Sequence, residues 1–198
     1  MSIASDVGGS VARKSRRIPG EEGLWIFIFG DALVFSVFFV VLLLFRGSNS
    51  ELYSASQEHL NQAFGVFNTA LLLSSSWLVA MAVKAARRGL GRLTPILMLL
   101  AVLCGGGFAV VKVLEWSEKI GAGITLITND FFMYYFIFTG IHFLHVMIGM
   151  AVLTVLALHC RSGVMDANKI RNLESGASFW HLVDLLWIVL FALFYLVK

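Results

Sequence analysis

Five long apolar stretches constrain the fold of this chain more than any other feature of its sequence. They cover approximately residues 23–45, 63–86, 94–116, 131–158 and 178–197. A helix needs about 20 consecutive, mostly apolar residues to cross the hydrocarbon core of a bilayer. Lipid offers no hydrogen-bonding partner to an open strand or loop, so such stretches cross as helices. The sequence therefore predicts an all-α membrane protein with a bundle of five transmembrane helices.

The composition excludes several other classes of protein. Hydrophobic residues make up 59% of the 198 residues and charged residues only 14%, whereas about 25% of an ordinary soluble domain is charged. A soluble protein of this size cannot bury so much apolar surface. The formal net charge of +3 comes from basic residues near helix ends, so it does not indicate nucleic-acid binding. Cys104 and Cys160 form neither a disulfide framework nor a Cys-x-x-Cys metal motif.

Lysine and arginine alternate between the two sides of the predicted membrane domain. The segment before the first stretch holds four of them: Arg13, Lys14, Arg16 and Arg17. The loops after the second and fourth stretches hold seven more, whereas the opposite side holds only three. Because cytoplasmic loops carry the excess of basic residues, we expect the N-terminus inside and the C-terminus outside. Residues 1–22 are then a basic cytoplasmic segment, and residues 23–198 form the transmembrane domain.

Ionisable side chains within the apolar stretches need partners inside the protein, because each costs roughly 2.5–3.5 kcal/mol on insertion scales. Asp31 lies in the first stretch. His142 and His145 are three residues apart in the fourth stretch and share a helix face. His181 and Asp184 have the same spacing in the last stretch, at a depth similar to that of Asp31. We expect these five residues to face the interior as a buried polar network, which is either structural or proton-related.

Two further patterns predict contacts between helices. Lys112 and Glu115 are three residues apart at the outer end of the third stretch, and we expect an interfacial ion pair with snorkelling side chains. Ala101, Gly105 and Ala109 form a ridge of small residues at every fourth position. Such a ridge lets two helix backbones approach closely.

The histidines do not form a complete cofactor site. Haem iron and zinc both need ligands that converge from fixed positions, but His142 and His145 are one turn apart on one helix, and the last stretch adds only His181. We therefore expect no catalytic residue, metal site or cofactor in this chain. Two alternatives stay open. One is a small transporter or channel that uses the buried Asp and His groups, although no transporter-type repeat is visible. The other is a stand-alone haem-binding membrane protein.

Four motifs follow one another between residues 20 and 197. Asn68–Ser75 reads N-T-x-x-L-L-x-S, and Glu115 with Trp116 forms an acidic-aromatic pair. Thr139–Gly149 reads T-G-x-H-x-x-H-V-x-x-G, and Glu174–Trp187 reads E-x-G-x-x-x-W-H-x-V-D-x-x-W. In this order the motifs resemble subunit III of the haem–copper oxidases, the cytochrome c oxidase subunit III-like family. The family has W-H-F-V-D in the last motif, where this chain has leucine in place of phenylalanine.

The resemblance also shows where this chain departs from larger members of that family. Those members have seven helices, and this chain corresponds to the last five. The two absent helices form one wall of a lipid-holding cleft, so a bound phospholipid is an open expectation here. The family's buried glutamate corresponds to Asp31. The run from Pro19 to Asp31 most resembles a small five-helix branch, the NorE-like accessory proteins of nitric oxide reductases.

By this resemblance, the chain is expected to be a non-catalytic accessory subunit in the bacterial cytoplasmic (inner) membrane. Its expected partners are membrane lipids and the catalytic large subunit of a haem–copper oxidase or nitric oxide reductase, with no nucleic acid. The haem and the copper or iron are expected in that large subunit. The accessory chain would stabilise the catalytic subunit and influence its proton uptake.

Overall fold

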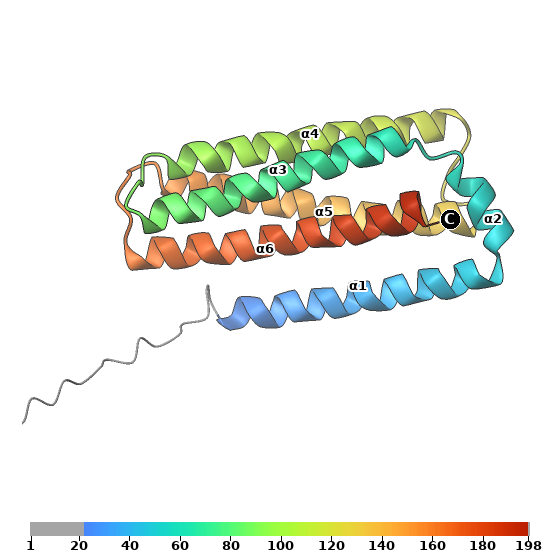
Figure 1. The fold of residues 1–198 in the computed structure, drawn as a ribbon, viewed down its shortest axis with the longest axis horizontal. Helices are drawn as coiled ribbons and strands as arrows, with labels where there is room; N and C mark the ends of the chain where they lie inside the picture. Colours follow the sequence, from blue (N-terminus) through green and yellow to red (C-terminus); the bar gives the residue numbers. More distant parts are fainter. Residues whose placement is uncertain (1–21, 198) are drawn as a thin grey trace, which may run out of the picture.

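The computed structural model describes residues 22–197 as an elongated bundle of helices (Figure 1). In chain order its elements are α1 (Glu22–Ser48), α2 (Ser50–Gln57), α3 (Gln62–Arg87), α4 (Thr94–Gly121), α5 (Asp130–His159), α6 (Ala167–Phe191) and the π-helical turn η1 (Ala192–Leu196). Within the described residues, α1, α3, α4, α5 and α6 with η1 are long and apolar enough to cross a membrane. The predicted all-α membrane architecture with five spans is confirmed. The side on which each terminus lies stays a prediction, and residues 1–21 of the predicted basic segment lie outside the described residues.

Capping residues place several helix ends away from the predicted boundaries. α6 begins eleven residues before the predicted start at 178, because the Asp166 carboxylate accepts a hydrogen bond from the Lys169 backbone N–H at 2.7 Å. Residues 167–177 are too polar for the apolar stretch, yet they are helical. Asn61 and Asn129 cap α3 and α5 in the same way. Hydropathy therefore located the span of the last helix but not its first turns, and it missed the short helix α2.

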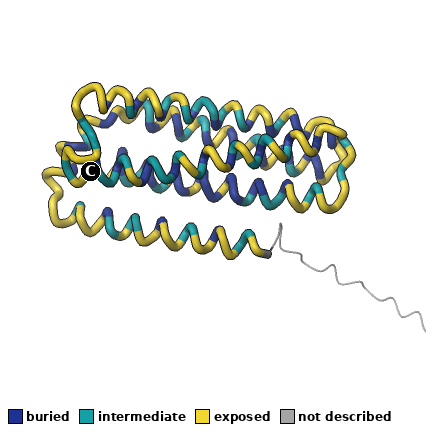
Figure 2. Tube along the Cα trace, turned by 180° about the vertical axis from the view of Figure 1, so that it is seen from behind, coloured by how far each residue is buried: buried dark blue, intermediate teal, exposed yellow. Residues whose placement is uncertain are grey.

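Four helices form the compact part of the molecule, and α1 lies beside it. α3, α4, α5 and α6 pack against one another, whereas α1 runs along α6 (Figure 1). Only 11% of the apolar segment of α1 is buried, against 61% of that of α6, and Figure 2 shows the same contrast along the chain. Aromatic pairs hold α1, with ring centroids 6.0 Å apart for Phe27 and Phe179 and 5.1 Å apart for Phe38 and Phe138. Thus α6 is the central helix, and α1 is the least enclosed one.

The core is built around large aromatic side chains of α6. Trp180 and Trp187 are both fully buried. Gly149 of α5 packs directly on the Trp180 ring, and a Cβ atom built there would lie only 2.6 Å from it. Gly105 of α4 approaches the same ring, with 3.0 Å left for a Cβ atom. Glycine at these two positions creates the space that the indole occupies.

The ridge of small residues on α4 lies partly within these contacts. Ala101 is buried, and its carbonyl accepts a hydrogen bond from the Ser75 hydroxyl of α3 at 2.8 Å. Gly105 is buried against α5 and α6, whereas Ala109 is only half-buried. The ridge therefore lies against three neighbours of α4, namely α3, α5 and α6, because a four-residue repeat drifts slowly around a helix with 3.6 residues per turn.

Candidate functional site

Asp31 and His145 form the polar link between α1 and the bundle. His145 Nε2 lies 3.2 Å from Asp31 Oδ1, and both side chains are half-buried. The other ring nitrogen of His145, Nδ1, lies 2.8 Å from the Ile141 carbonyl oxygen. A carbonyl only accepts hydrogen bonds, so Nδ1 carries a hydrogen. The Nε2 contact with the carboxyl group is then favourable only if one more proton lies between them. The geometry therefore describes a polar contact that joins α1 to α5 within the membrane domain.

His142 does not join that pair, although it is only three residues away. Its side chain is fully buried, and its Nε2 lies 3.0 Å from the Val183 carbonyl oxygen of α6. Phe108 and Trp187 surround the ring, with centroids 5.7 and 5.3 Å from it. Because the carbonyl accepts, Nε2–H donates. His142 therefore connects α5 to α6 inside the bundle rather than to α1.

Hydrogen bonds connect α3 to α6 and η1 at several positions along the interface between these antiparallel helices. At its inner end, as the sequence orients it, Arg87 Nε donates to Glu174 Oε1 at 2.8 Å. At its middle, Ser76 Oγ lies 2.6 Å from His181 Nδ1. Further along, the Trp187 indole N–H donates to Thr69 Oγ1 at 3.0 Å, and the Gln62 amide donates to the Tyr195 carbonyl at 2.8 Å. Ser76 and His181 are 105 residues apart in the sequence, so no local spacing predicts their contact.

His181 and Asp184 therefore do not share a network with Asp31. His181 was expected to face the interior, and this is wrong, because its side chain is exposed on the outer surface of α6. Asp184 is buried beside Ser76, and its Oδ1 has no hydrogen-bond partner among the described residues. The expected single network is thus three separate contacts: α1 with α5, α5 with α6, and α6 with α3.

Lys112 and Glu115 pair within α4, in a cluster that also recruits two tyrosines. Lys112 Nζ donates to Glu115 Oε2 at 3.0 Å, to the Tyr135 hydroxyl at 3.0 Å and to the Tyr195 hydroxyl at 3.1 Å. The Tyr195 hydroxyl in turn donates to Glu115 Oε1 at 2.6 Å. All three hydrogens of the ammonium thus have acceptors. Lys112 and Glu115 are both 0% exposed, so the expected snorkelling toward the interface is wrong.

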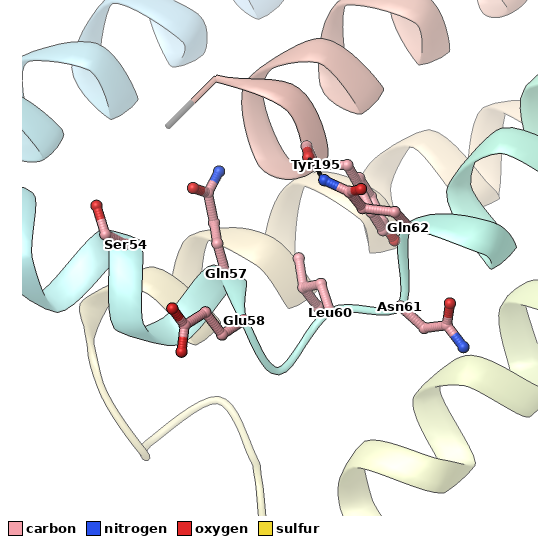
Figure 3. A pocket seen from close by; sticks show the side chains of 7 residues that line it. All are labelled: Ser54, Gln57, Glu58, Leu60, Asn61, Gln62 and Tyr195. Carbon is pink, nitrogen blue, oxygen red and sulfur yellow. Dashed lines mark hydrogen bonds between the residues drawn. The ribbon is translucent and has the colours of Figure 1, made fainter.

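Gln57 at the end of α2 and Gln62 at the start of α3 bond to the end of η1, which carries Tyr195. The Gln57 amide donates to the carbonyl oxygens of Phe194 at 3.0 Å and Val197 at 2.7 Å. Figure 3 shows Gln57 and Gln62 pointing toward the end of the chain across a hollow, and the Gln62 amide reaches the Tyr195 carbonyl. Carbonyl groups at the end of a helix lack partners within it. The two glutamines supply those partners, and this explains the polar lining of the hollow.

Most ring nitrogens of His142, His145 and His181 already contact a group of the protein. Nδ1 and Nε2 of His145, Nε2 of His142 and Nδ1 of His181 are all engaged. Between residues 22 and 197, no three side chains of His, Cys, Asp or Glu gather closely enough to hold a metal ion. The arrangement is suited to bracing helices.

Comparison with known proteins connects this arrangement with a family. The model of the family described as cytochrome c oxidase subunit III matches residues 18–198. This chain belongs to the cytochrome c oxidase subunit III family. It is a multi-pass membrane protein and, as a subunit of the subunit III type, a non-catalytic accessory one. The family resemblance predicted from the four motifs is confirmed, whereas the NorE-like branch stays a prediction.

Curated relatives of this subunit III chain cover most of its length. Cytochrome c oxidase subunit 3 of Thermostichus vulcanus is 30% identical over 179 residues, which cover 88% of this chain and 85% of the relative. Quinol oxidase subunit 3 of Bacillus subtilis (strain 168) is 26% identical over 180 residues, with the same coverage. Heme-copper oxidase subunit I+III of Aeropyrum pernix is 24% identical over 189 residues, which cover 89% of this chain and 22% of that longer protein.

Proposed function

We propose that this chain is the accessory subunit of a terminal oxidase and binds the oxidase's catalytic large subunit in the bacterial cytoplasmic membrane. The observation that carries the proposal is the family match over residues 18–198. The Aeropyrum pernix relative supports the choice of partner, because its name joins subunit I and subunit III in one chain. The relatives from Thermostichus vulcanus and Bacillus subtilis support an oxidase rather than a nitric oxide reductase, since both are named as oxidase subunits.

The haem and copper belong to the large subunit in this proposal. The imidazoles of His142 and His145 support this assignment, because each already bonds to a neighbouring helix or to its own backbone. A haem ligand would have to give up such a contact within a bilayer that offers no replacement. What this chain supplies is a rigid four-helix body, and beside it the Asp31–His145 pair.

The Asp31–His145 pair is the part of the chain that we connect with proton uptake by the complex. Asp31 lies nine residues beyond the start of α1, which is about 13 Å at 1.5 Å per residue. It is therefore within the membrane but closer to the predicted cytoplasmic end. A pair of ionisable groups at this depth is suited to passing protons toward a neighbouring subunit or to keeping them from leaking.

Affinity purification of the tagged full chain from its native membrane in a mild detergent tests the proposal. We expect the catalytic large subunit to co-purify, with all haem absorbance in that subunit after the two are separated. Turnover of the complex with oxygen and with nitric oxide then distinguishes an oxidase from a nitric oxide reductase. A haem spectrum from the isolated chain would contradict the proposal. Ion flux through liposomes that contain the chain alone would also do so, by favouring a transporter or channel.

A further inference from the structure

We propose that the outer surface around His181 is the site where a membrane-spanning helix of the catalytic large subunit docks. This inference rests on the proposed function and adds the location of the interface. We call this surface the His181 face. It consists of six residues from α3 and α6: Leu73, Ser76, Ser178, His181, Leu185 and Ile188.

The depth of His181 is the first argument. His181 lies within the apolar part of α6, and its Nδ1 is 2.6 Å from Ser76 Oγ of α3. Its partner Ser76 lies fourteen residues from the start of α3 and eleven from its end. Because Ser76 lies near the midpoint of α3, the contact lies within the hydrocarbon depth of the bundle. An exposed imidazole at this position faces the hydrocarbon of the bilayer unless a protein covers it.

The exposure of His181 is unusual among the ionisable side chains of the described spans. Asp31 and His145 are half-buried and contact each other. The remaining ionisable side chains in the middle portions of the spans are buried: Lys112, Glu115, His142 and Asp184. Charged and polar groups within a membrane almost always face the protein interior or a partner. His181 is the one that the bundle itself leaves uncovered.

Hydrogen bonding within the chain satisfies only one side of the imidazole. Nδ1 contacts Ser76 Oγ at 2.6 Å, whereas Nε2 makes no hydrogen bond to any described residue. Lipid chains cannot supply the missing partner. A transmembrane helix that carries a hydroxyl, amide or carboxyl group at mid-membrane depth can supply it. The chemistry of the face therefore favours a protein helix over lipid.

The surroundings of His181 fit a helix contact as well. Leu73, Leu185 and Ile188 are exposed by 48%, 57% and 36%, and they lie one or two turns from Ser76 or His181 on the same two helices. On α6, positions 178, 181, 185 and 188 fall on one face, because residues three and four apart are neighbours on a helix. Figure 1 shows α6 running between α3 and α1, and no other labelled helix covers it on the near side. Such a face offers a partner helix both a hydrogen-bonding group and apolar contact area.

The catalytic subunit is the occupant that the relatives favour. In the Aeropyrum pernix protein, a region similar to this chain occupies 22% of a chain whose name includes subunit I. When subunit I and subunit III are parts of one chain, the two regions lie in the same membrane and close to each other.

Photo-crosslinking in the intact complex, within native membranes, tests the proposal. The photoreactive residue p-benzoylphenylalanine replaces Leu185 on the His181 face or, as a control, Leu144 of α5. The control is well matched, because Leu144 is 58% exposed and also lies mid-span. We expect a crosslink to the large subunit from position 185 and none from position 144. A crosslink from 185 only to lipid or to a second copy of this chain would overturn the proposal, as would crosslinking to the large subunit from 144 alone.

Substitutions at the anchor give an independent measurement. His181→Leu removes the imidazole without adding a polar group, and we expect roughly a three- to tenfold weaker retention of the large subunit, in line with interhelical hydrogen bonds in membranes. His181→Gln retains a hydrogen-bonding side chain and should restore much of the loss. Ser76→Ala removes the internal bond but leaves Nε2, so retention should change little. Equal retention in all three variants and the unmodified chain would refute the role of His181.

The two proposals fail in different ways. If no large subunit co-purifies with the unmodified chain, the proposed function is wrong. If the large subunit co-purifies normally but crosslinks only from position 144, the function stands and the docking surface is wrong. Thermal unfolding of the purified His181→Leu chain serves as the control for folding, because weaker retention counts only if the variant unfolds at a similar temperature.

Discussion

Replacing Glu115 by leucine is the most informative perturbation of the core. The carboxylate accepts hydrogen bonds from the Lys112 ammonium at 3.0 Å and from the Tyr195 hydroxyl at 2.6 Å. Glu115→Leu removes both and leaves a fully buried ammonium group with two phenols as its partners. Removing one partner of a buried ion pair costs about 3–5 kcal/mol. For a chain of this length, that corresponds to a Tm lower by about 6–20 °C.

The double variant Lys112→Met/Glu115→Leu distinguishes the contribution of the ion pair to stability from that of side-chain packing. It removes both charges and replaces them with apolar side chains of similar size, a change that is often close to neutral. The hydroxyls of Tyr135 and Tyr195, 3.4 Å apart, can still bond to each other. We therefore expect the double variant to lose less than about 2 kcal/mol and to be more stable than Glu115→Leu alone.

Unfolding of the purified full chain in detergent, followed by tryptophan fluorescence, measures these differences. Glu118→Leu is the matched control, because Glu118 lies on the same helix, is 58% exposed and contacts Lys119 only at 4.0 Å. We expect that control to stay within about 0.5 kcal/mol of the unmodified chain. If Glu115→Leu costs no more than Glu118→Leu, or if the double variant loses as much stability as Glu115→Leu alone, the buried pair does not stabilise the bundle as argued.

Three further predictions concern other parts of the chain. Asp31→Asn removes the carboxylate that contacts His145 at 3.2 Å, so the complex should lose activity sooner during turnover while its haem absorbance stays unchanged; loss of haem would contradict the accessory role. Gly149→Ala places a Cβ atom 2.6 Å from the Trp180 ring, and should cost about 1–3 kcal/mol in an unfolding titration. A cysteine introduced at position 88 or 90, both of which are exposed, should react with an impermeant maleimide only from the cytoplasmic side. In the same experiment Cys160 should react slowly, because burial raises the pKa of its thiol and leaves less thiolate at neutral pH.

The number and nature of the spans follow from the sequence because length and apolarity alone determine whether a helix can cross a bilayer. The partners of the polar side chains do not follow from it. His142 and His145 share a face by their spacing, yet a step of three residues rotates a helix by about 60° from alignment. α5 packs between several neighbours, so this rotation is enough to direct His142 to α6 and His145 to α1.

The tyrosines of the Lys112 cluster show a second limit. Tyr135 lies 23 residues and Tyr195 lies 83 residues from Lys112 along the chain, so no local spacing connects them. The pair Lys112–Glu115 is visible in the sequence because it lies within one helix. Its burial is not, since burial depends on η1 returning Tyr195 to α4. A buried charge in a predicted span could nevertheless have directed attention to the hydroxyl groups of neighbouring spans.

The last motif of the sequence, Glu174–Trp187, lies on α6, the central helix of the bundle, and its residues contact several neighbouring helices. Trp180 fills the space between Gly105 and Gly149 on two other helices. One turn later, the Val183 carbonyl accepts from His142 of α5. Between them, His181 contacts Ser76 of α3 and turns its remaining nitrogen outward. Successive residues of one helix point about 100° apart, so four consecutive positions can reach each neighbouring helix and the outer surface. The motif therefore marks the point where the internal contacts of the bundle meet the face that we assign to the catalytic subunit.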